Sequence, residues 1–424
     1  MIGYFVGWLG LIIANMPVAF SLIVMGLSWL VIEGQALTSA PQRLIGGIDS
    51  FPLLAVPCFI LAGIAMNTGG VTERIYGFAR ALVGHFTGGL GHVNVTGSLI
   101  FSGMSGSAIA DAGGLGLLEI KAMKEDGYPA DFAGALTCAS CIIGPLVPPS
   151  IPMVLYGVIA NASVGALFLA GIVPGLLTAL FLMVHVYFYA RRRNFPRHPR
   201  STLPQLWAAF RRAFLALVTP VIIMGGIFGG IFTPTESAAI ACVWAFFVTV
   251  VIYRDYKLAE LPHMIGRVVR TVGMVMIMIG FSVAFGYMMA IMRIPAQATE
   301  LFVAISPDKY TFLFYVNVLL LVLGTFMDLA PMLLICTPIF MPVIAKFGID
   351  PVHFGIVMIF NLGIGLLTPP VGPTLAVGCA IGKVSMEAVS RSIMVFYVPM
   401  LVVLGLVTYI PALTLWLPQL LLGR

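Results

Sequence analysis

Long apolar stretches run along the whole chain, and glycine, proline or clusters of charge separate each from the next. About 20 apolar residues suffice for a helix to cross the hydrocarbon core of a bilayer, so the chain has room for about ten crossings. The period-2 alternation of polarity typical of a membrane β-barrel is absent. The interruptions predict spans near 2–14, 17–32, 51–68, 132–160, 164–190, 214–232, 237–253, 271–291, 353–382 and 392–418.

Two further apolar stretches, near 93–118 and 312–345, predict helical hairpins that enter and leave the membrane on one side. An amphipathic arm precedes each half's hairpin, at 71–88 and at 257–270. A span interrupted by prolines follows each hairpin. The order of elements in the first half of the chain is therefore repeated in the second half.

The two halves also match at a fixed offset of 221 residues. Without gaps, positions 140–157 contain seven identities with their counterparts, against about one or two expected from average composition. The same offset places Gly103 on Gly324 and Ser107 on Asp328. Repeats with interrupted segments at matching positions are the best sequence indication of a transporter binding site. The identical pairs are Ile143 and Ile364, Gly144 and Gly365, Leu146 and Leu367, Pro148 and Pro369, Pro149 and Pro370, Pro152 and Pro373, and Gly157 and Gly378.

Hairpins that return to the side they entered leave an odd number of crossings in each half, so the second half must be inverted relative to the first. We therefore expect an all-α integral membrane protein built from two inverted-topology repeats, each with a re-entrant helical hairpin and a proline-broken helix. The first repeat covers 1–190 and the second covers 214–424. A basic cytoplasmic linker, 191–213, joins them.

Composition and charge indicate that most of the protein surface is in contact with lipid. Apolar residues make up 60% of the chain and charged residues only 9%, with a mean hydropathy of +1.07, whereas soluble domains carry about 25% charged residues. With the linker in the cytoplasm, 17 of the 22 Lys and Arg residues fall in inside loops and 5 outside, as the positive-inside rule requires. Both termini are then expected outside, with 2–14 retained as the first span because it lacks the features of a signal peptide. The net charge of +6 thus reflects membrane orientation and does not indicate nucleic acid as a partner.

The proline pairs at 148–149 and 369–370 cannot lie inside continuous helix, because proline lacks an N–H and clashes with the preceding turn. Each unpaired backbone group in hydrocarbon costs several kcal/mol unless something polar bonds to it. Carbonyl groups at such a break can bind a cation, and the N-terminus of the following half-helix can face an anion. Plain proline kinks are the alternative interpretation, but each break is matched with a polar hairpin, which favours binding sites.

The hairpin tips supply oxygen ligands. Residues 102–114 contain three serines, four glycines and Asp111, and the second tip contains Asp328. These are the only two acids expected at membrane depth in the hairpins, and intramembrane carboxylates usually mark ion paths. Hard oxygen ligands favour Na⁺ or H⁺ over a transition metal, and the Cys138–Cys141 pair lies in an apolar run as small buried side chains. For each aspartate, a helix cap is the structural alternative.

We therefore predict two cation sites, one in each repeat, between a hairpin tip and a helix break. The first combines Ser105, Ser107, Asp111, Gly144, Pro145 and Pro148. The second combines Gly324, Thr325, Asp328, Asn361, Gly365, Thr368 and Gly372.

Several long motifs resemble the large membrane subunit of the TRAP (tripartite ATP-independent periplasmic) transporters, of the DctM and SiaM type. The resemblance extends over the whole chain and its motifs are specific. They are the runs Ser105–Gly114, Thr137–Ser140, Ile143–Pro152, Asp350–Gly355 and Leu367–Gly372, together with Asn361.

This resemblance implies Na⁺-coupled secondary import of a small organic acid, of the sialic acid or C4-dicarboxylate class, and no enzymatic activity. It implies two or more Na⁺ ions, a small four-span membrane subunit, a periplasmic substrate-binding protein, and the bacterial cytoplasmic membrane with both termini periplasmic. It also implies an elevator mechanism, in which 93–160 and 312–382 move as the transport core. The scaffold would then comprise 1–92, 161–190, 214–311 and 383–424.

The substrate is expected between the two tips. No arginine lies in the core motifs, so an organic anion would be held by helix N-termini, hydroxyl groups and bound Na⁺. The predicted substrate residues are Ser102, Gly103, Ser107, Ser150, Thr368, Pro369 and Pro370.

Two other functions share some of these features. An intramembrane aspartyl protease needs two carboxyl groups that share a proton at close range, whereas Asp111 and Asp328 lie in opposite repeats, each beside its own break. A related cation-coupled carrier without a binding protein would have the same physical features. Only the family resemblance, or uptake measured without partners, separates that carrier from a TRAP transporter.

Overall fold

The computed structural model describes residues 7–8, 10–12, 14, 16–34, 36–68, 70–254, 258–369 and 371–423. Within these ranges the regular secondary structure is helical, without any strand. The apolar character of the chain explains this, because a segment in lipid must satisfy its own backbone hydrogen bonds. The expectation of an all-α membrane protein is confirmed.

In the first half, most predicted spans are present with small shifts, and one unpredicted helix, α3, precedes the third span. The predicted span at 2–14 lies largely outside the described residues. The helices are α2 (Val18–Ile32), α3 (Ser39–Ile48), η1 (Phe51–Leu54), α4 (Ala55–Thr68), α5 (Val71–Val83), α6 (Gly89–Ser105), α7 (Ala108–Gly113), α8 (Leu115–Glu125), α9 (Ala130–Cys141), α10 (Ile143–Leu146), α11 (Ile151–Ile159) and α12 (Val164–Arg193).

The second half repeats this order, again with one unpredicted helix, α16, before the hairpin. Its elements are α13 (Leu203–Phe228), α14 (Pro234–Phe246), η2 (Phe247–Ile252), η3 (Leu258–Glu260), α15 (Leu261–Ile291), α16 (Ile294–Ile305), α17 (Lys309–Gly324), α18 (Leu329–Lys346), α19 (Pro351–Gly365), α20 (Pro373–Gly382), α21 (Met386–Tyr409) and α22 (Ala412–Leu422).

Helix boundaries follow the offset of 221 residues found in the sequence. The last residue of α8, Glu125, falls on the last residue of α18, Lys346, and the start of α9 at Ala130 falls on the start of α19 at Pro351. The hairpins differ in one respect: the first returns through two short helices, α7 and α8, on either side of Gly114, whereas the second returns through the single helix α18. The repeat therefore extends beyond the matched motifs to the end of each hairpin and the start of each broken helix.

Several predicted boundaries are wrong for identifiable reasons. The linker is shorter than 191–213, because Thr202 and Gln205 form a capping box that starts α13 at Leu203. The second arm and its span form one helix of 31 residues, since no proline interrupts the chain between Pro262 and Pro295. The first hairpin extends over 89–125 rather than 93–118. The first hairpin therefore includes the charged residues of α8, which lie beyond its predicted end at 118.

Six helices of the described chain are long and apolar enough to cross a membrane, and eight if each of two bent pairs counts as one crossing. One bent pair is the expected interrupted span, in which α9–α10 and α11 meet at 43°. The other, α3 with η1 and α4 at 61°, was not predicted. The break between α19 and α20, at 366–372, lies where the second proline pair predicts it.

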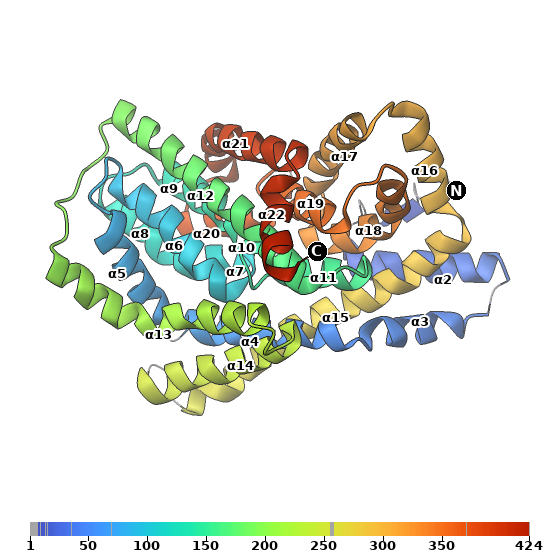
Figure 1. Cartoon of the computed structure of the whole chain (residues 1–424), viewed down its shortest axis with the longest axis horizontal. Helices are drawn as coiled ribbons and strands as arrows, with labels where there is room; N and C mark the ends of the chain where they lie inside the picture. Colours follow the sequence, from blue (N-terminus) through green and yellow to red (C-terminus); the bar gives the residue numbers. More distant parts are fainter. Residues whose placement is uncertain are drawn as a thin grey trace.

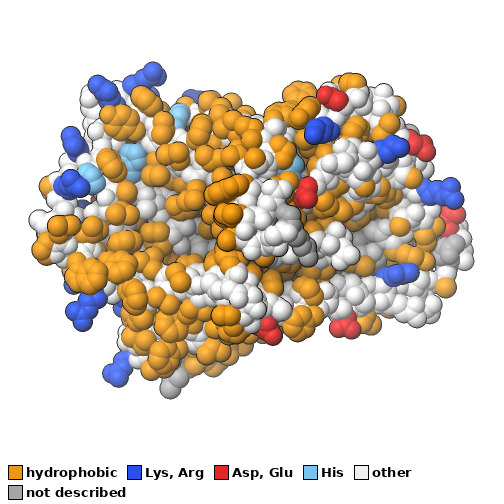
Figure 2. All heavy atoms as spheres, in the orientation of Figure 1, with side chains coloured by type: hydrophobic (Ala, Val, Ile, Leu, Met, Phe, Trp, Pro, Cys, Tyr) orange, Lys and Arg blue, Asp and Glu red, His pale blue; other side chains and the backbone are white. Residues whose placement is uncertain are grey.

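The helices form two layers (Figure 1). In this view α2, α3, α4, α13, α14 and α15 run along the lower side, and the hairpins and broken helices lie above them. Helix α15 packs on α2, α3 and α4, and α14 packs on α4 and α13. Figure 2 shows apolar side chains over most of this face, with Lys and Arg gathered at the left end and charges of both signs at the right.

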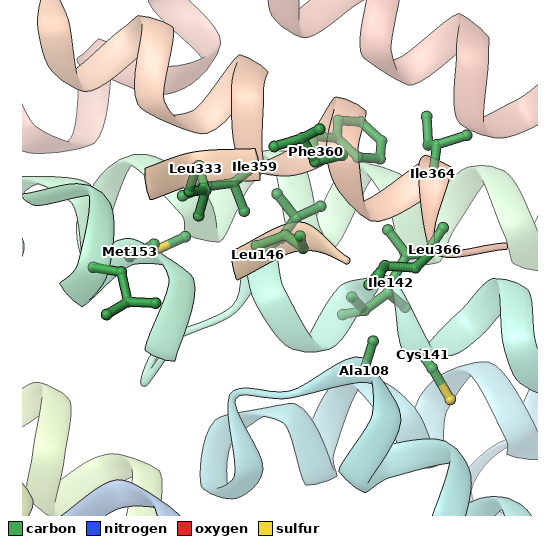
Figure 3. Packing of buried hydrophobic residues seen from close by; sticks show 14 of the residues in the cluster. Ala108, Cys141, Ile142, Leu146, Met153, Leu333, Ile359, Phe360, Ile364 and Leu366 are labelled. Carbon is green, nitrogen blue, oxygen red and sulfur yellow. The ribbon is translucent and has the colours of Figure 1, made fainter. Parts of the chain in front are cut away.

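The two halves interlock in the upper layer. Helix α20 packs on α7, α8 and α9, so the second half of one broken helix lies beside the other repeat's hairpin. Likewise, α11 packs on α18 and α19. Lys124 Nζ donates to the carbonyl oxygen of Gly382 at 3.0 Å, and Tyr156 Oη donates to that of Pro351 at 2.7 Å. Figure 3 shows the apolar part of this contact, with Leu146 of α10 in one buried cluster with Ile359 of α19.

Candidate transport site

The first hairpin tip lies directly against the first helix break. Gly106 has φ +60°, a left-handed conformation that favours glycine, and a Cβ there would overlap the carbonyl oxygen of Pro149. A Cβ on Gly144 would lie 3.3 Å from the backbone carbon of Ser107. The structure therefore brings together the tip and the break that the sequence pairs as the first cation site.

Two serines position the short helices at this contact. Ser107 Oγ accepts a hydrogen bond from the backbone N–H of Ala110 at 3.4 Å and caps α7. Ser150 Oγ accepts from the N–H of Met153 at 3.3 Å, which caps α11, and donates to the carbonyl oxygen of Pro145 at 2.6 Å. Ser150 therefore acts within the break and is fully buried. The N-terminus of α11, which carries a partial positive charge, lies beside the first tip.

The second hairpin tip meets the second break in the same way. A Cβ on Gly365 would lie 2.7 Å from the Cα of Gly324, so the two backbones are in direct contact. The N–H of Val371 donates to the carbonyl oxygen of Thr325 at 3.3 Å. Asp328 caps α18, since its Oδ1 accepts from the N–H of Leu329 at 2.7 Å. The cap considered as the alternative for the aspartates is thus present at Asp328.

Polar side chains of the second break are anchored to neighbouring helices. Asn361 Nδ2 donates to Asn317 Oδ1 at 2.7 Å, while its own Oδ1 is buried without a hydrogen-bond partner. Thr368 Oγ1 donates to the carbonyl oxygen of Ile364 at 3.0 Å and lies 3.2 Å from Tyr397 Oη of α21. Asn361 is therefore held with one free acceptor, the kind of oxygen that suits Na⁺.

A cavity of about 450 Å³ lies between the two tips and the lower layer. Ser105, Gly106 and Ser107 line it from the first tip, and Asp328 lines it from the second. The hydroxyl of Ser105 is buried and has no hydrogen-bond partner. Helices α4 and α15 close the opposite wall through Ile60, Gly63, Ile64, Asn67, Thr271, Val275 and Met278. The cavity is thus lined by residues of both repeats.

Apart from Ser107, the predicted substrate residues that the structure describes do not line this cavity. Ser102 is fully buried and donates to the carbonyl oxygen of Leu99 at 2.8 Å. A Cβ on Gly103 would contact Pro220 of α13 at 3.0 Å. Pro369 is exposed, and Pro370 lies outside the described residues.

The two predicted aspartates differ in their surroundings. Asp328 lines the cavity, whereas Asp111 is fully buried behind the tip, beside Ser98 and Cys141. Of the remaining residues predicted for the first site, Pro145 lines the cavity. The carbonyl oxygen of Pro148 lies 3.9 Å from a Cβ placed on Gly103.

Sequence reasoning missed two polar residues on the lower wall, Asn67 and Thr271, and one buried acid, Glu119. Asn67 lies at the end of an apolar run, and a polar residue at such a position could have indicated a functional site. Glu119 lies beyond the predicted end of the first hairpin and near two lysines in the sequence. A charged stretch of this kind predicts an exposed loop, so the burial of Glu119 was not expected. Glu119 is nevertheless 1% exposed, so the first hairpin contains a second buried acid, one residue beyond the end predicted for it.

Comparison with known proteins places these features in a family. The model of the DctM component of the tripartite ATP-independent periplasmic transporters matches residues 5–413. The sialic acid TRAP transporter large permease protein SiaM of Vibrio cholerae is 48% identical over 424 residues, which cover 100% of this chain and 99% of that protein. The sialic acid TRAP transporter permease protein SiaT of Haemophilus influenzae is 44% identical over 98% of this chain and 68% of its own length.

A relative with another substrate in its name is the C4-dicarboxylate TRAP transporter large permease protein DctM of Pseudomonas aeruginosa, 39% identical over 93% of this chain and 92% of its own. Among solved structures, the YdaH transporter of Alcanivorax borkumensis has a TM-score of 0.63 at 13% identity, over 88% of each chain. That likeness supports the fold alone. The sequence motifs, the full-length family match and the multi-pass helical architecture agree, and the chain belongs to the family of TRAP transporter large permease subunits.

Proposed function

We propose that this chain imports a small organic acid, with sialic acid as the first candidate, by Na⁺-coupled secondary transport across the bacterial inner membrane. The observation that carries the proposal is the cavity bounded by both hairpin tips and by α4 and α15. Its volume of about 450 Å³ lies within the range of small-molecule sites, roughly 300–1,000 Å³.

The lining of the cavity favours an anion held together with Na⁺. Among its described residues there is no Lys, Arg or His, and the one charged residue is the acidic Asp328. An organic anion would be repelled by Asp328 unless a cation neutralised that carboxylate first. Hydroxyl groups at Ser105 and Ser107, and the N-terminus of α11 at Ile151, offer donors to a carboxylate. This arrangement couples substrate binding to Na⁺ binding.

The two Na⁺ sites that we propose are those between each tip and its break. In the first, the free hydroxyl oxygen of Ser105 and backbone carbonyls near Pro145 and Pro148 supply ligands, with the negative charge of Asp111 behind them. In the second, the free Oδ1 of Asn361 and backbone oxygens near Gly324 and Thr368 supply ligands, with Asp328 nearby. Such backbone and side-chain oxygens replace the hydration shell of a hard cation.

Transport would follow an elevator mechanism in which the interlocked hairpins and broken helices, 93–160 and 312–382, move as one body. The hydrogen bond from Lys124 to Gly382 and that from Cys138 Sγ to the carbonyl oxygen of Thr374 join the two repeats within this body. Helix α21 also bonds to it, through Tyr397 Oη and the carbonyl oxygen of Leu367 at 3.0 Å. Helix α12 packs on α21 and on α6. We therefore extend the proposed moving body to α12 and α21, and keep α2–α5 and α13–α16 as scaffold.

As a TRAP large permease subunit, the chain would work with a small membrane subunit and a periplasmic binding protein that delivers substrate. Lys and Arg gather at one end of the molecule in Figure 2, which supports placing that end in the cytoplasm. Both termini would then be periplasmic.

Substrate choice is tested in cells that lack their own sialic acid and C4-dicarboxylate uptake and express this chain with its small subunit and binding protein. We expect labelled sialic acid to accumulate, and unlabelled sialic acid, but not excess succinate, to compete. The two relatives named for sialic acid support this expectation. Accumulation of succinate alone would assign the chain to the C4-dicarboxylate class that the third relative represents. Accumulation of neither acid would contradict the proposed function.

A further inference from the structure

A polar network lies inside the first hairpin, away from the cavity. Asn94 Nδ2 of α6 donates to Thr137 Oγ1 of α9 at 2.6 Å, and Ser140 Oγ donates to Asn94 Oδ1 at 2.7 Å. Ser98 Oγ donates to Ser140 Oγ at 3.0 Å. All four side chains are fully buried. These groups satisfy one another and so leave little hydrogen-bonding capacity for a neighbouring carboxylate.

Two acids face the same short stretch of α6. The carboxylate of Glu119 on α8 lies against Gly97, where an added Cβ would be 2.7 Å from its Oε1. Asp111 on α7 lies beside Ser98, the next residue of α6, and beside Cys141. Asp111 is 0% and Glu119 is 1% exposed. The two carboxylates also interact electrostatically with each other and with Cys141, so both lie in the interior of the hairpin within range of one another.

Neither acid has a charged partner in the part of the chain that the structure describes. Both carboxylate oxygens of Glu119 are buried without a hydrogen bond, and Asp111 has only the hydroxyl of Ser98 and the thiol of Cys141 beside its carboxylate. No Lys, Arg or His there forms an ion pair with either residue. Glu119 is thus a fully buried side chain without a partner, and its carboxylate interacts electrostatically with that of Asp111. Burying one unpaired carboxylate is costly, and two like charges at short range add to that cost. A cation between the two carboxylates would offset both costs.

Packing does not require polar residues at these positions, as the second repeat demonstrates. At the offset of 221 residues, the counterparts of Ser98, Asp111 and Glu119 are apolar. They are Leu319, Met332 and Phe340. The second hairpin, which returns through the single helix α18, thus has buried apolar residues, Met332 and Phe340, where the first has its two acids. This difference points to a ligand as the reason for the two acids in the first repeat.

We infer that Asp111 and Glu119 bind a Na⁺ ion inside the first hairpin, between α6, α7 and α8, in addition to the ion proposed at the tip. Carboxylate oxygens are hard ligands that suit such a cation. The ion at the tip and the ion inside the hairpin together carry two positive charges, which balance the two negative charges of Asp111 and Glu119. Asp111 lies between the two ions. This inference rests on the proposed Na⁺ coupling, and its site has no counterpart in the second repeat.

The test measures Na⁺ binding directly. The full chain, purified with its small subunit, is titrated with ²²Na⁺ at constant pH and ionic strength, with choline as the replacement ion. The variant is Glu119→Gln, which keeps the size of the side chain and removes its charge. The matched control is Glu125→Gln, six residues further along α8, where the carboxylate is 68% exposed and pairs only with Lys121.

We expect Glu119→Gln to bind about one Na⁺ fewer per chain than the wild type, and Glu125→Gln to match the wild type. Melting in Na⁺-free buffer provides a check on folding, since removing an unneutralised buried charge should keep or raise the melting temperature of Glu119→Gln. A folded Glu119→Gln with unchanged Na⁺ stoichiometry and affinity would overturn the inference and assign a proton to the pair. A wild type that binds no Na⁺ would instead overturn the proposed Na⁺ coupling itself.

Discussion

Gly365→Ala is expected to reduce substrate uptake by about tenfold or more while the protein still reaches the membrane. The added Cβ would lie 2.7–2.8 Å from the Cα, carbonyl carbon and oxygen of Gly324, all of them backbone atoms that cannot turn aside. The tip of the second hairpin must then move away from its helix break. Overpacking of this kind costs about 1–3 kcal/mol, and here it separates groups that would bind Na⁺.

The matched control is Gly405→Ala in α21, where an added Cβ meets nothing within 4 Å. Both substitutions replace a helical glycine by alanine, so they share any gain in helix propensity. Uptake should remain at the wild-type level in Gly405→Ala. If Gly365→Ala also transported normally at equal expression, the contact between the second tip and its break would have no part in transport.

Asp328→Asn is expected to weaken the apparent affinity for Na⁺ by about tenfold or more. Asparagine and aspartate cap helices about equally well, so the variant should keep the bond to the N–H of Leu329 and the start of α18. What it loses is the one negative charge on the cavity wall. The measurement is the initial uptake rate as a function of external Na⁺.

Asp308→Asn is the control for the cap. Asp308 caps α17 through the N–H of Thr311 at 2.9 Å and lies at an exposed position away from the cavity. Its replacement should leave the Na⁺ dependence unchanged. If Asp328→Asn and Asp308→Asn both show the Na⁺ dependence of the wild type, Asp328 acts only as a helix cap, which is the alternative that the sequence left open.

The helix breaks could be predicted from sequence because proline chemistry decides them locally. No neighbouring structure can restore the missing N–H of Pro149 or Pro369, so the breaks appear where the sequence places them. The tips were predictable for a similar reason, since serine, glycine and aspartate cap and end helices. Ser107 and Asp328 occupy matching positions in the repeat and both cap a helix.

Features that depend on long-range packing could not be predicted. Glu119 belongs to a helix with exposed charges on its other faces, and only the packing of α8 on α6 shows that this acid faces inward. The direction of the Asp111 side chain, away from the cavity, is likewise a consequence of how α7 lies on α9. The packing of α20 beside the first hairpin brings together residues more than 200 positions apart in the sequence. A local sequence pattern cannot predict such a contact.

The measurement that tests the account most directly is uptake of labelled sialic acid into proteoliposomes that contain this chain and its small subunit. The binding protein is added outside, and an inward Na⁺ gradient is either imposed or replaced by choline. We predict accumulation above the external concentration only when both the Na⁺ gradient and the binding protein are present. Equal accumulation without Na⁺ would contradict the proposal that the cavity between the two hairpin tips couples substrate movement to Na⁺.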